Sequence, residues 1–271
     1  MKKKGFDYEK IVWGGGLIRL RPTYFSARRL KKTLKAIKNC DGKLLDVGCG
    51  VGDYLEAISF YRPDLELFGL DVSREAIRLA KQRKIKAEFR LGRAEKLGFK
   101  ESSFEVVTCV DLLEHVEQPR QVLKEIYRVL KPGGAMELIV PIEGNLWSLE
   151  GVLIRLGWQE RERYGGHIQQ FSIKRVKQLL REAGFEITTV SWGGHLLYQL
   201  VEMVYLTYLS IRGKKTTQSV EGYLATMKPG LKRGLMRLIK DLLAAVIYFE
   251  SWLFGFMAGI SMQVSCTKGK R

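Results

Sequence analysis

Short apolar runs alternate with amphipathic stretches between residues 44 and 141. Apolar runs of this length predict buried strands, and apolar residues three or four apart predict helices. The expected strands lie near residues 44–47, 66–71, 87–91, 104–110 and 135–140. The expected helices lie near residues 53–60, 73–83 and 118–130. Such alternation is typical of a parallel sheet with helices on both faces, which binds ligands at the carboxyl ends of its strands.

The C-terminal half adds two strands that are separated by a long insertion. Residues 172–183 predict a helix, and Ser73 and Ser172 are the expected N-caps of their helices. The sixth strand is expected at residues 185–192 and the last at 260–266, about 65 residues later. We therefore expect a seven-stranded, mostly parallel α/β sheet. The predicted parts are an N-terminal arm and helix (1–43), a core (44–194), a helical insertion (195–259) and a last strand with a basic tail (260–271).

Three glycines at alternate positions follow the first predicted strand: Gly48, Gly50 and Gly52. Glycine lets the backbone approach a ligand closely, and the helix that follows offers free N–H groups. Strand, glycine turn and helix are the layout of a nucleotide-cofactor site, although Gly-x-Gly-x-Gly differs from the spacing of dinucleotide binders. Asp71 ends the second predicted strand, 19 residues after Gly52, and suits the two hydroxyls of a ribose. A turn without a ligand and a helix-capping acid are the alternatives.

Six blocks in order resemble the class I S-adenosylmethionine (SAM)-dependent methyltransferases. They are LLDVGCGVG (44–52), GLDVS (69–73), GRAEKLGF (92–99), FEVVTCVDLLEHV (104–116), EIYRVLKPGG (125–134) and MELIVP (136–141). A later block, GHIQQFSIKRVKQLLREAGFEI (166–187), is also similar to this family. The resemblance covers roughly residues 40–193 and implies a Rossmann-like fold and an enzyme that takes a methyl group from SAM.

The resemblance also assigns cofactor-binding residues. They are expected to be Asp46, Gly48, Gly50, Gly52, Asp71, Val72, Ala94, Glu95 and Val110. Asp46 and Gly48 would line the methionine part of SAM, and Asp71 would hold the ribose hydroxyls. Ala94 and Glu95 would border the adenine. Val110 ends the fourth predicted strand and would face the other side of the cofactor.

Methyl transfer from SAM needs few catalytic side chains, because the cofactor carries its own leaving group. A sulfonium methyl group is transferred by direct displacement, so the protein mainly orients and desolvates the reactants. A hydroxyl acceptor also requires a general base. The candidates are Asp111, Glu114, His115 and His167. His167 follows two glycines in a loop expected at the active face, and tying that loop is its alternative role.

The segment 104–116 is similar to the fourth-strand motif of ubiquinone-pathway O-methyltransferases. In that motif an acid-x-x-Glu-His pattern can hold a divalent metal, and Asp111 takes the acid position here. Leu-Glu-His-Val also occurs in methyltransferases without this metal, and we predict no metal site. For His115, a structural role, a general base and a metal ligand all stay open.

Two segments flank the predicted site. Residues 23–39 predict a basic amphipathic helix that packs on the sheet or, alternatively, covers the cofactor or touches a membrane. Residues 142–165 leave the carboxyl end of the fifth predicted strand and carry Trp147, Trp158 and Tyr164. We interpret them as a substrate lid, with a connecting helix over residues 148–156 as the alternative.

The excess of positive charge lies at the two ends of the chain, whose formal net charge is +17. Residues 1–43 hold 13 lysines and arginines against 3 acids, residues 195–271 hold 11 against 4, and residues 44–194 hold 22 of each. A basic surface suggests phosphates on nucleic acid or anionic lipid. The four cysteines lack metal-like spacing, and no apolar run follows the first lysines. We therefore expect a cytoplasmic protein with reduced thiols and no cleaved leader.

Two apolar segments fill the insertion, at residues 195–211 and 231–259. As helices, residues 195–211 (about 26 Å) and 242–260 (about 28 Å) approach the roughly 30 Å of bilayer hydrocarbon. Glu202 and Glu250 fall near their centres, however, and a charge there costs roughly 2.5–3.5 kcal/mol. Aromatic and flanking basic residues favour a helix that lies in the membrane interface. A spanning hairpin and a lid or dimer contact are the alternatives, and His195 is expected to be a boundary residue.

The sequence therefore predicts a SAM-dependent methyltransferase (EC 2.1.1.-) that is peripheral on the cytoplasmic membrane face. Its expected acceptor is small and lipophilic, such as a quinone, isoprenoid or lipid, and its expected partner is an anionic membrane surface. One alternative is an RNA methyltransferase whose basic ends bind phosphate, although no RNA-binding module is recognised. The other is a non-catalytic SAM-binding partner protein, against which the intact motif around Asp46, Gly50 and Asp71 argues.

Overall fold

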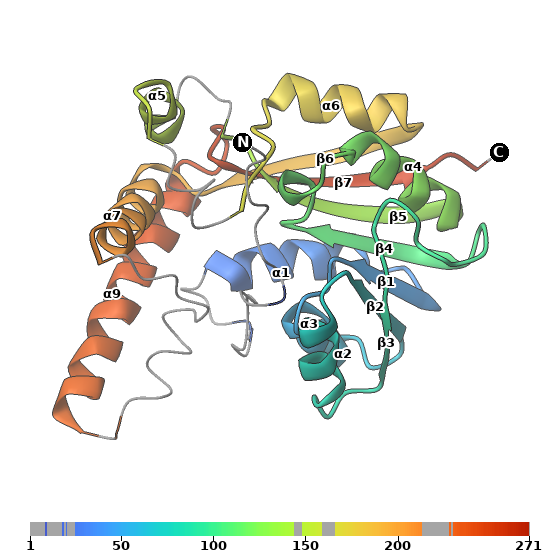
Figure 1. Ribbon diagram of the computed structural model, residues 1–271, viewed down its shortest axis with the longest axis horizontal. Coiled ribbons are helices and arrows are strands. Elements are labelled where there is room, and N and C mark those ends of the chain that lie inside the picture. The colour runs from blue at the N-terminus through green and yellow to red at the C-terminus, as the bar shows by residue number, and fades with distance from the viewer. Residues whose placement is uncertain are drawn as a thin grey trace.

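The computed structural model describes residues 9, 18, 20, 25–143, 148–158, 166–212, 228 and 230–270. Its centre is a sheet of seven strands in the order β3-β2-β1-β4-β5-β7-β6 (Figure 1). The strands are β1 (Lys43–Val47), β2 (Glu66–Asp71), β3 (Ala87–Leu91), β4 (Phe104–Val110), β5 (Leu130–Pro141), β6 (Phe185–Gly193) and β7 (Ser261–Lys268). Strands β1 to β5 pair in parallel, and β7 runs antiparallel to both of its neighbours. The predicted mostly parallel α/β sheet is confirmed.

Helices cover both faces of the sheet. They are α1 (Phe25–Ala36), α2 (Asp53–Tyr61), α3 (Arg74–Lys81), α4 (Pro119–Val129), α5 (Leu149–Arg155), α6 (Ile173–Glu182), α7 (Leu196–Arg212) and α9 (Leu231–Leu253), with a short 3₁₀ turn at Leu113–His115. In Figure 1, α1, α2 and α3 lie below the sheet, and α4 and α6 lie above it. The Ser73 hydroxyl accepts a hydrogen bond from the Ala76 amide (3.1 Å), and the Ser172 hydroxyl accepts one from the Arg175 amide (3.2 Å). Both predicted N-caps are confirmed.

Alternate side chains of each strand enter opposite faces of the sheet. In β1, Leu45 and Val47 join the buried cluster under α4 and α6, whereas Leu44 joins the cluster under α1 and α2. Leu30 and Ile37 are fully buried in this second cluster. The basic helix α1 therefore packs on the sheet, which is the first of its predicted roles.

The structure differs from the prediction at the start of β5. The sequence places this strand at residues 135–140, but β5 begins at Leu130, directly after α4. Leu130 is fully buried and pairs with Phe104 of β4 before the register shifts and pairing resumes at Ala135. The buried leucine holds the chain against β4, so that Pro132 and its glycine neighbours lie within the strand rather than before it.

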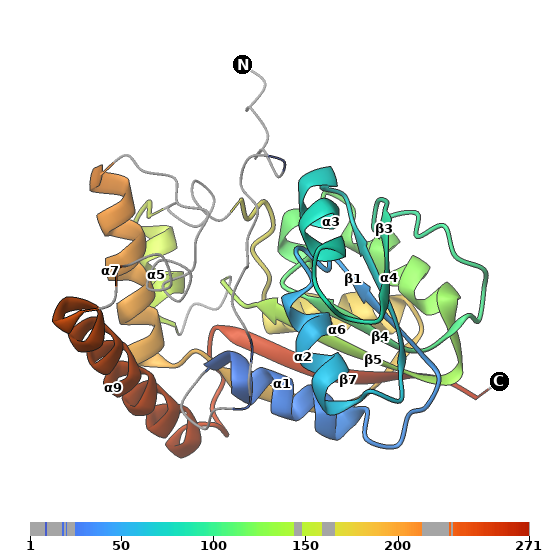
Figure 2. The same ribbon diagram turned by 90° about the horizontal axis from the view of Figure 1, so that it is seen from below.

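Helices α5, α7 and α9 stand beyond the carboxyl ends of the parallel strands (Figures 1 and 2). The α7 and α9 helices form the predicted insertion between β6 and β7. Their junction is polar: the Leu197 amide donates to Oε1 of Glu250 (2.9 Å), and Nε2 of His195 donates to the Met257 carbonyl (3.2 Å). Glu250 is thus buried within the protein, and His195 lies at the boundary where it was predicted. None of the described helices is long and apolar enough to cross a membrane.

The predicted lid is described only in part. Trp147 and Tyr164 lie outside the described residues. Between them, α5 begins at an N-cap in which the Ser148 hydroxyl accepts a hydrogen bond from the Gly151 amide (3.0 Å). This helix agrees with the alternative of a connecting helix. All four cysteines are free thiols, as expected.

Candidate active site

One carboxylate joins the glycine turn after β1 to the end of β2. Asp71 accepts hydrogen bonds from the amides of Gly50 (2.8 Å) and Ser73 (2.9 Å). Burial raises the pKa of Asp71, and these donors act in the opposite direction. Gly48 adopts a φ of +77°, and a side chain there would come within 2.9 Å of Leu112. The turn therefore needs glycine at this position, and Asp71 is held at the strand tip.

An open cleft with an empty volume of about 910 Å³ lies at this edge of the sheet. It is lined by Gly48, Leu70, Asp71, Val72, Gly92, Arg93, Ala94, Glu95, Leu112, His115, Val116, Glu117 and Ile168. These residues come from the ends of β1 and β2, from the segments after β3 and β4, and from the loop before α6. A glycine backbone, a carboxylate at a strand tip and an apolar wall together fit a nucleoside and its ribose hydroxyls. Five of the nine predicted cofactor residues line the cleft: Gly48, Asp71, Val72, Ala94 and Glu95.

The other four predicted cofactor residues lie outside the lining. Asp46 is buried beneath the turn, 2% exposed, and accepts a hydrogen bond from the Thr108 hydroxyl (2.6 Å). Burial raises the pKa of Asp46 to about 7. Gly50 and Gly52 belong to the turn itself, and Gly52 directly precedes α2. Val110 packs against the cluster under α1 and α2. The direct contacts of these four residues with the cofactor stay predictions.

A cluster of titratable side chains lies beside the cleft: Glu114, His115, Glu143 and His167. His115 lines the cleft, and its ring packs edge-to-face on that of His167, with centroids 4.9 Å apart. Nδ1 of His167 is hydrogen-bonded to Oε1 of Glu143. Nδ1 of His115 lies 3.2 Å from the Gly166 carbonyl. Because a carbonyl oxygen only accepts, this nitrogen of His115 carries the proton.

Backbone hydrogen bonds bring the two histidines together. The Glu114 carbonyl accepts from the amides of Ile168 (2.8 Å) and Gln169 (3.1 Å). Burial, followed by the neighbouring His167, lowers the pKa of His115 to about 4. Burial, followed by Asp111, raises the pKa of Glu114 well above its ordinary value. At neutral pH the His115 ring is therefore neutral and can accept a proton at Nε2.

Glu114, His115 and His167 can also hold a metal ion together. Each offers one ligand atom, and these atoms lie within 4.8 Å of one another. Two imidazoles and a carboxylate are donors that Zn²⁺ takes. Asp111 does not join this group, because it pairs with Arg29 (2.6 Å). The set thus differs from the acid-x-x-Glu-His pattern, and the absence of a metal stays a prediction.

Two acids near the site, Glu143 and Glu9, are not among the residues that the sequence predicts. Glu143 is 2% exposed and follows β5 by two residues, at the edge where such sheets bind ligands. That position is a local signal, but its partner His167 lies 24 residues away. Glu9 accepts hydrogen bonds from the amides of Arg74 (2.8 Å) and Glu75 (3.1 Å), two and three residues after Val72 of the cleft. Glu9 therefore lies at the rim of the cofactor cleft.

The fold and the cleft define an enzyme class that binds a nucleoside cofactor at the ends of β1 and β2. Residues 45–138 match the family described as a methyltransferase domain. The chain is 38% identical over 176 residues to the demethylmenaquinone methyltransferase of Lactococcus lactis subsp. lactis, which covers 57% of this chain and 70% of that protein. It is 37% identical over 118 residues to the demethylmenaquinone methyltransferase of Chlorobaculum parvum, which covers 42% of this chain and 48% of that protein.

Solved structures agree on the fold. The YcgJ protein of Bacillus subtilis is similar with a TM-score of 0.58 and 19% identity, covering 90% of this chain and 99% of that chain. The chain belongs to the class I SAM-dependent methyltransferases. The methyltransferase domain implies SAM as its cofactor. The chain spans about half the length of the Chlorobaculum relative.

Proposed function

We propose that this protein transfers the methyl group of SAM to a lipophilic acceptor at a membrane surface. The position of the apolar insertion carries the proposal. Helices α7 and α9 stand beyond the edge of the sheet that holds the cleft and the histidine cluster (Figure 2). A lipophilic acceptor bound at these helices would lie on the side of the molecule where the cofactor binds.

The α9 helix exposes apolar side chains along its whole length. The exposed ones are Leu231, Leu235, Leu238, Ile239, Leu242, Leu243, Val246, Phe249, Trp252 and Leu253. Large exposed apolar patches mark interaction sites with proteins or membranes. Lys232 and Arg237 are exposed near the start of the same helix. An apolar face with basic residues and a tryptophan is typical of a helix that lies in the interface of an anionic membrane.

The Glu143–His167 pair supports proton removal from an acceptor hydroxyl. The carboxylate of Glu143 accepts a hydrogen bond from the protonated Nδ1 of His167, so Nε2 is the atom of this ring that can take a proton. A carboxylate behind an imidazole holds the tautomer and stabilises the imidazolium that forms. SAM supplies the methyl group and its own leaving group when bound. His115, whose ring contacts His167 and lines the cleft, is the second candidate base.

The names of the similar proteins support the acceptor class. Both curated relatives described above are named demethylmenaquinone methyltransferases. A quinone is one of the lipophilic acceptors that the exposed helices would accommodate. We therefore propose a quinone, isoprenoid or other lipid as the acceptor.

The experiment follows radiolabel from SAM into a total lipid extract and, separately, into total RNA. The wild type is compared with Asp71→Ala and His167→Ala, and Glu101→Gln, an exposed acid before β4, is the control. Label in lipid that requires Asp71 and His167 supports the proposal. Label only in RNA would favour the alternative that the basic chain ends suggest. Label in neither fraction, with SAM still bound, would refute the lipid acceptor.

A further inference from the structure

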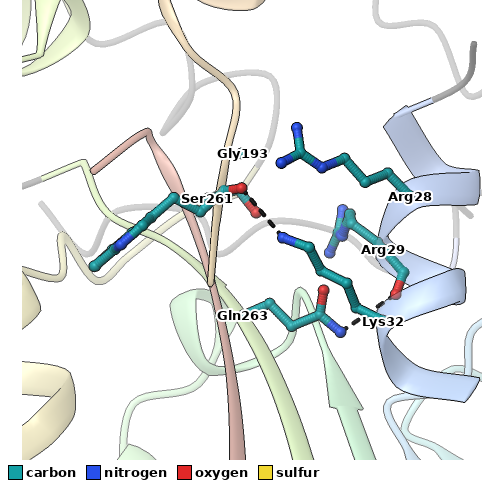
Figure 3. Close-up of a pocket in the computed structure, with 7 residues that line it drawn as sticks. Arg28, Arg29, Lys32, Gly193, Ser261 and Gln263 are labelled. Atoms are coloured by element: carbon teal, nitrogen blue, oxygen red, sulfur yellow. Dashed lines mark hydrogen bonds between the residues drawn. The ribbon is translucent and has the colours of Figure 1, made fainter. Parts of the chain in front are cut away.

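A second, smaller pocket lies between α1 and the ends of β6 and β7 (Figure 3). It is a shallow depression, much smaller than the cofactor cleft. Ser261 in its wall pairs with Pro141, the last residue of β5. The pocket therefore opens at the same edge of the sheet as the cleft, on the side of the apolar insertion.

Three cations of α1 extend toward this pocket: Arg28, Arg29 and Lys32 (Figure 3). Arg29 pairs with Asp111, but no carboxylate among the described residues pairs with Arg28 or Lys32. Nη1 of Arg28 is buried without a hydrogen-bond partner in this part of the chain. Nζ of Lys32 lies 3.4 Å from the Trp192 carbonyl. Burial lowers the pKa of Arg28, and burial followed by Arg28 lowers the pKa of Lys32 to about 8.

Two partly buried like charges destabilise each other unless an anion lies between them. The planar fork of Arg28 matches the oxygens of a phosphate, and the ammonium group of Lys32 adds a second donor. Ser261 lies in the same wall and offers a hydroxyl, whereas Nε2 of the neighbouring Gln263 already donates to Glu137, Thr33 and the Arg29 carbonyl.

The surroundings of Arg28 indicate what carries that anion. A side chain at Gly255 would come within 2.6 Å of Nη2 of Arg28, so the guanidinium lies against the turn that follows α9. Around this turn Trp252, Phe254 and Phe256 are exposed, and Phe256 is 80% exposed. An anion site that borders exposed aromatic side chains fits an amphiphile with an anionic head and an apolar tail.

We propose that Arg28 and Lys32 bind the phosphate of a membrane lipid whose apolar chains lie against the turn after α9. The bound lipid would fix the orientation of the cleft toward the membrane. This inference rests on the membrane location in the proposed function, but it does not require the bound lipid to be methylated. Lipid binding and methyl transfer are therefore separate measurements.

The test uses two soluble probes on the full chain: glycerol 3-phosphate and dihexanoylphosphatidic acid below its micelle concentration. Affinity is measured by titration calorimetry for Arg28→Gln and Lys32→Gln. Lys31→Gln and Lys35→Gln remove the same charge from exposed positions of the same helix. Each pocket variant should weaken both probes about tenfold or more, because a charge-assisted hydrogen bond is lost. Each exposed variant should change affinity less than about twofold, since surface charges are screened.

The lipid probe should bind more tightly than glycerol 3-phosphate, and Phe256→Ser should remove that gain. Equal affinity for the two probes would overturn the assignment to a lipid. Equal losses in all four charge variants, or no binding of either probe, would overturn the site. SAM affinity measured on the same samples shows that each variant is folded, because neither cation lines the cofactor cleft. If Arg28→Gln folds poorly, Arg28→Lys takes its place: this variant keeps the charge but loses the planar fork, so it should bind both probes more weakly than the wild type, and unchanged affinity would overturn the role of Arg28.

Discussion

Replacing Asp71 tests the cofactor site most directly. Its carboxylate accepts two amide hydrogen bonds, from Gly50 and Ser73, and we expect it to accept two more from the ribose hydroxyls. A hydrogen bond to a charged group contributes about 1.5–3 kcal/mol. Losing both ribose contacts in Asp71→Ala should therefore cost about 3–6 kcal/mol, which raises the Kd for SAM roughly 10²- to 10⁴-fold.

The loss of stability in this variant should be smaller than the loss of affinity. The amides of Gly50 and Ser73 lose their acceptor, but water can reach this half-buried position, so we expect about 1–3 kcal/mol in urea unfolding without SAM. Calorimetry with SAM measures the first effect. Glu66→Gln, an exposed acid at the opposite end of β2, is the matched control and should change the Kd less than about twofold. If Asp71→Asn bound SAM within about threefold of the wild type, the assignment to the ribose would be wrong.

Three further predictions concern catalysis, pH and the membrane. His167→Ala should lower kcat about 10²- to 10⁴-fold with little change in SAM affinity, and near-normal turnover would remove this residue from the mechanism. Because the folded-state pKa of His115 is about 4 and the unfolded value about 6.5, the unfolded chain binds more protons between these pH values. Wild-type stability should therefore rise with pH from 4 to 6.5, by about 3 kcal/mol relative to His115→Gln in urea titrations. Trp252→Ser should weaken flotation with anionic liposomes about tenfold, whereas Phe60→Ser, exposed on α2, should not; a wild type that stays with the soluble fraction would rule out the membrane location.

The fold could be predicted because its determinants are local. Strands β1, β2 and β4 are short, largely apolar runs, and Ser73 and Ser172 mark helix starts by bonds that span three residues. The start of β5 is predicted less accurately, because it depends on a contact between residues that are distant in the sequence. Leu130 belongs to β5 because it pairs with Phe104, a partner 26 residues earlier.

The candidate site could be predicted only in part for the same reason. The turn and Asp71 lie within short motifs, so their positions follow from the sequence. Glu143 is not predicted because its partner, His167, is distant in the sequence. The two side chains meet because the Glu114 carbonyl accepts hydrogen bonds from the loop before α6. Asp111 is a predicted base, but its carboxylate forms an ion pair with Arg29 of α1. The two residues are 82 positions apart, so their spacing along the chain does not predict the pair.

In helix α1 the sequence predicts the buried apolar face but not the surroundings of each basic residue. The period of the apolar residues over 23–39 predicts a helix that packs on the sheet, and the buried Leu30 and Ile37 agree with this. The sequence does not distinguish its basic residues from one another, but the structure does: Lys31 and Lys35 are exposed, whereas Arg28 and Lys32 line a pocket. The opposite wall of that pocket comes from β6 and β7, more than 150 residues away along the chain, and the turn after α9 lies against Arg28. The number of basic residues therefore suggests a phosphate partner but does not say which residues bind it. Arg28 and Lys32 can be singled out only from the structure, because β6 and β7 from the C-terminal part of the chain form the pocket around them.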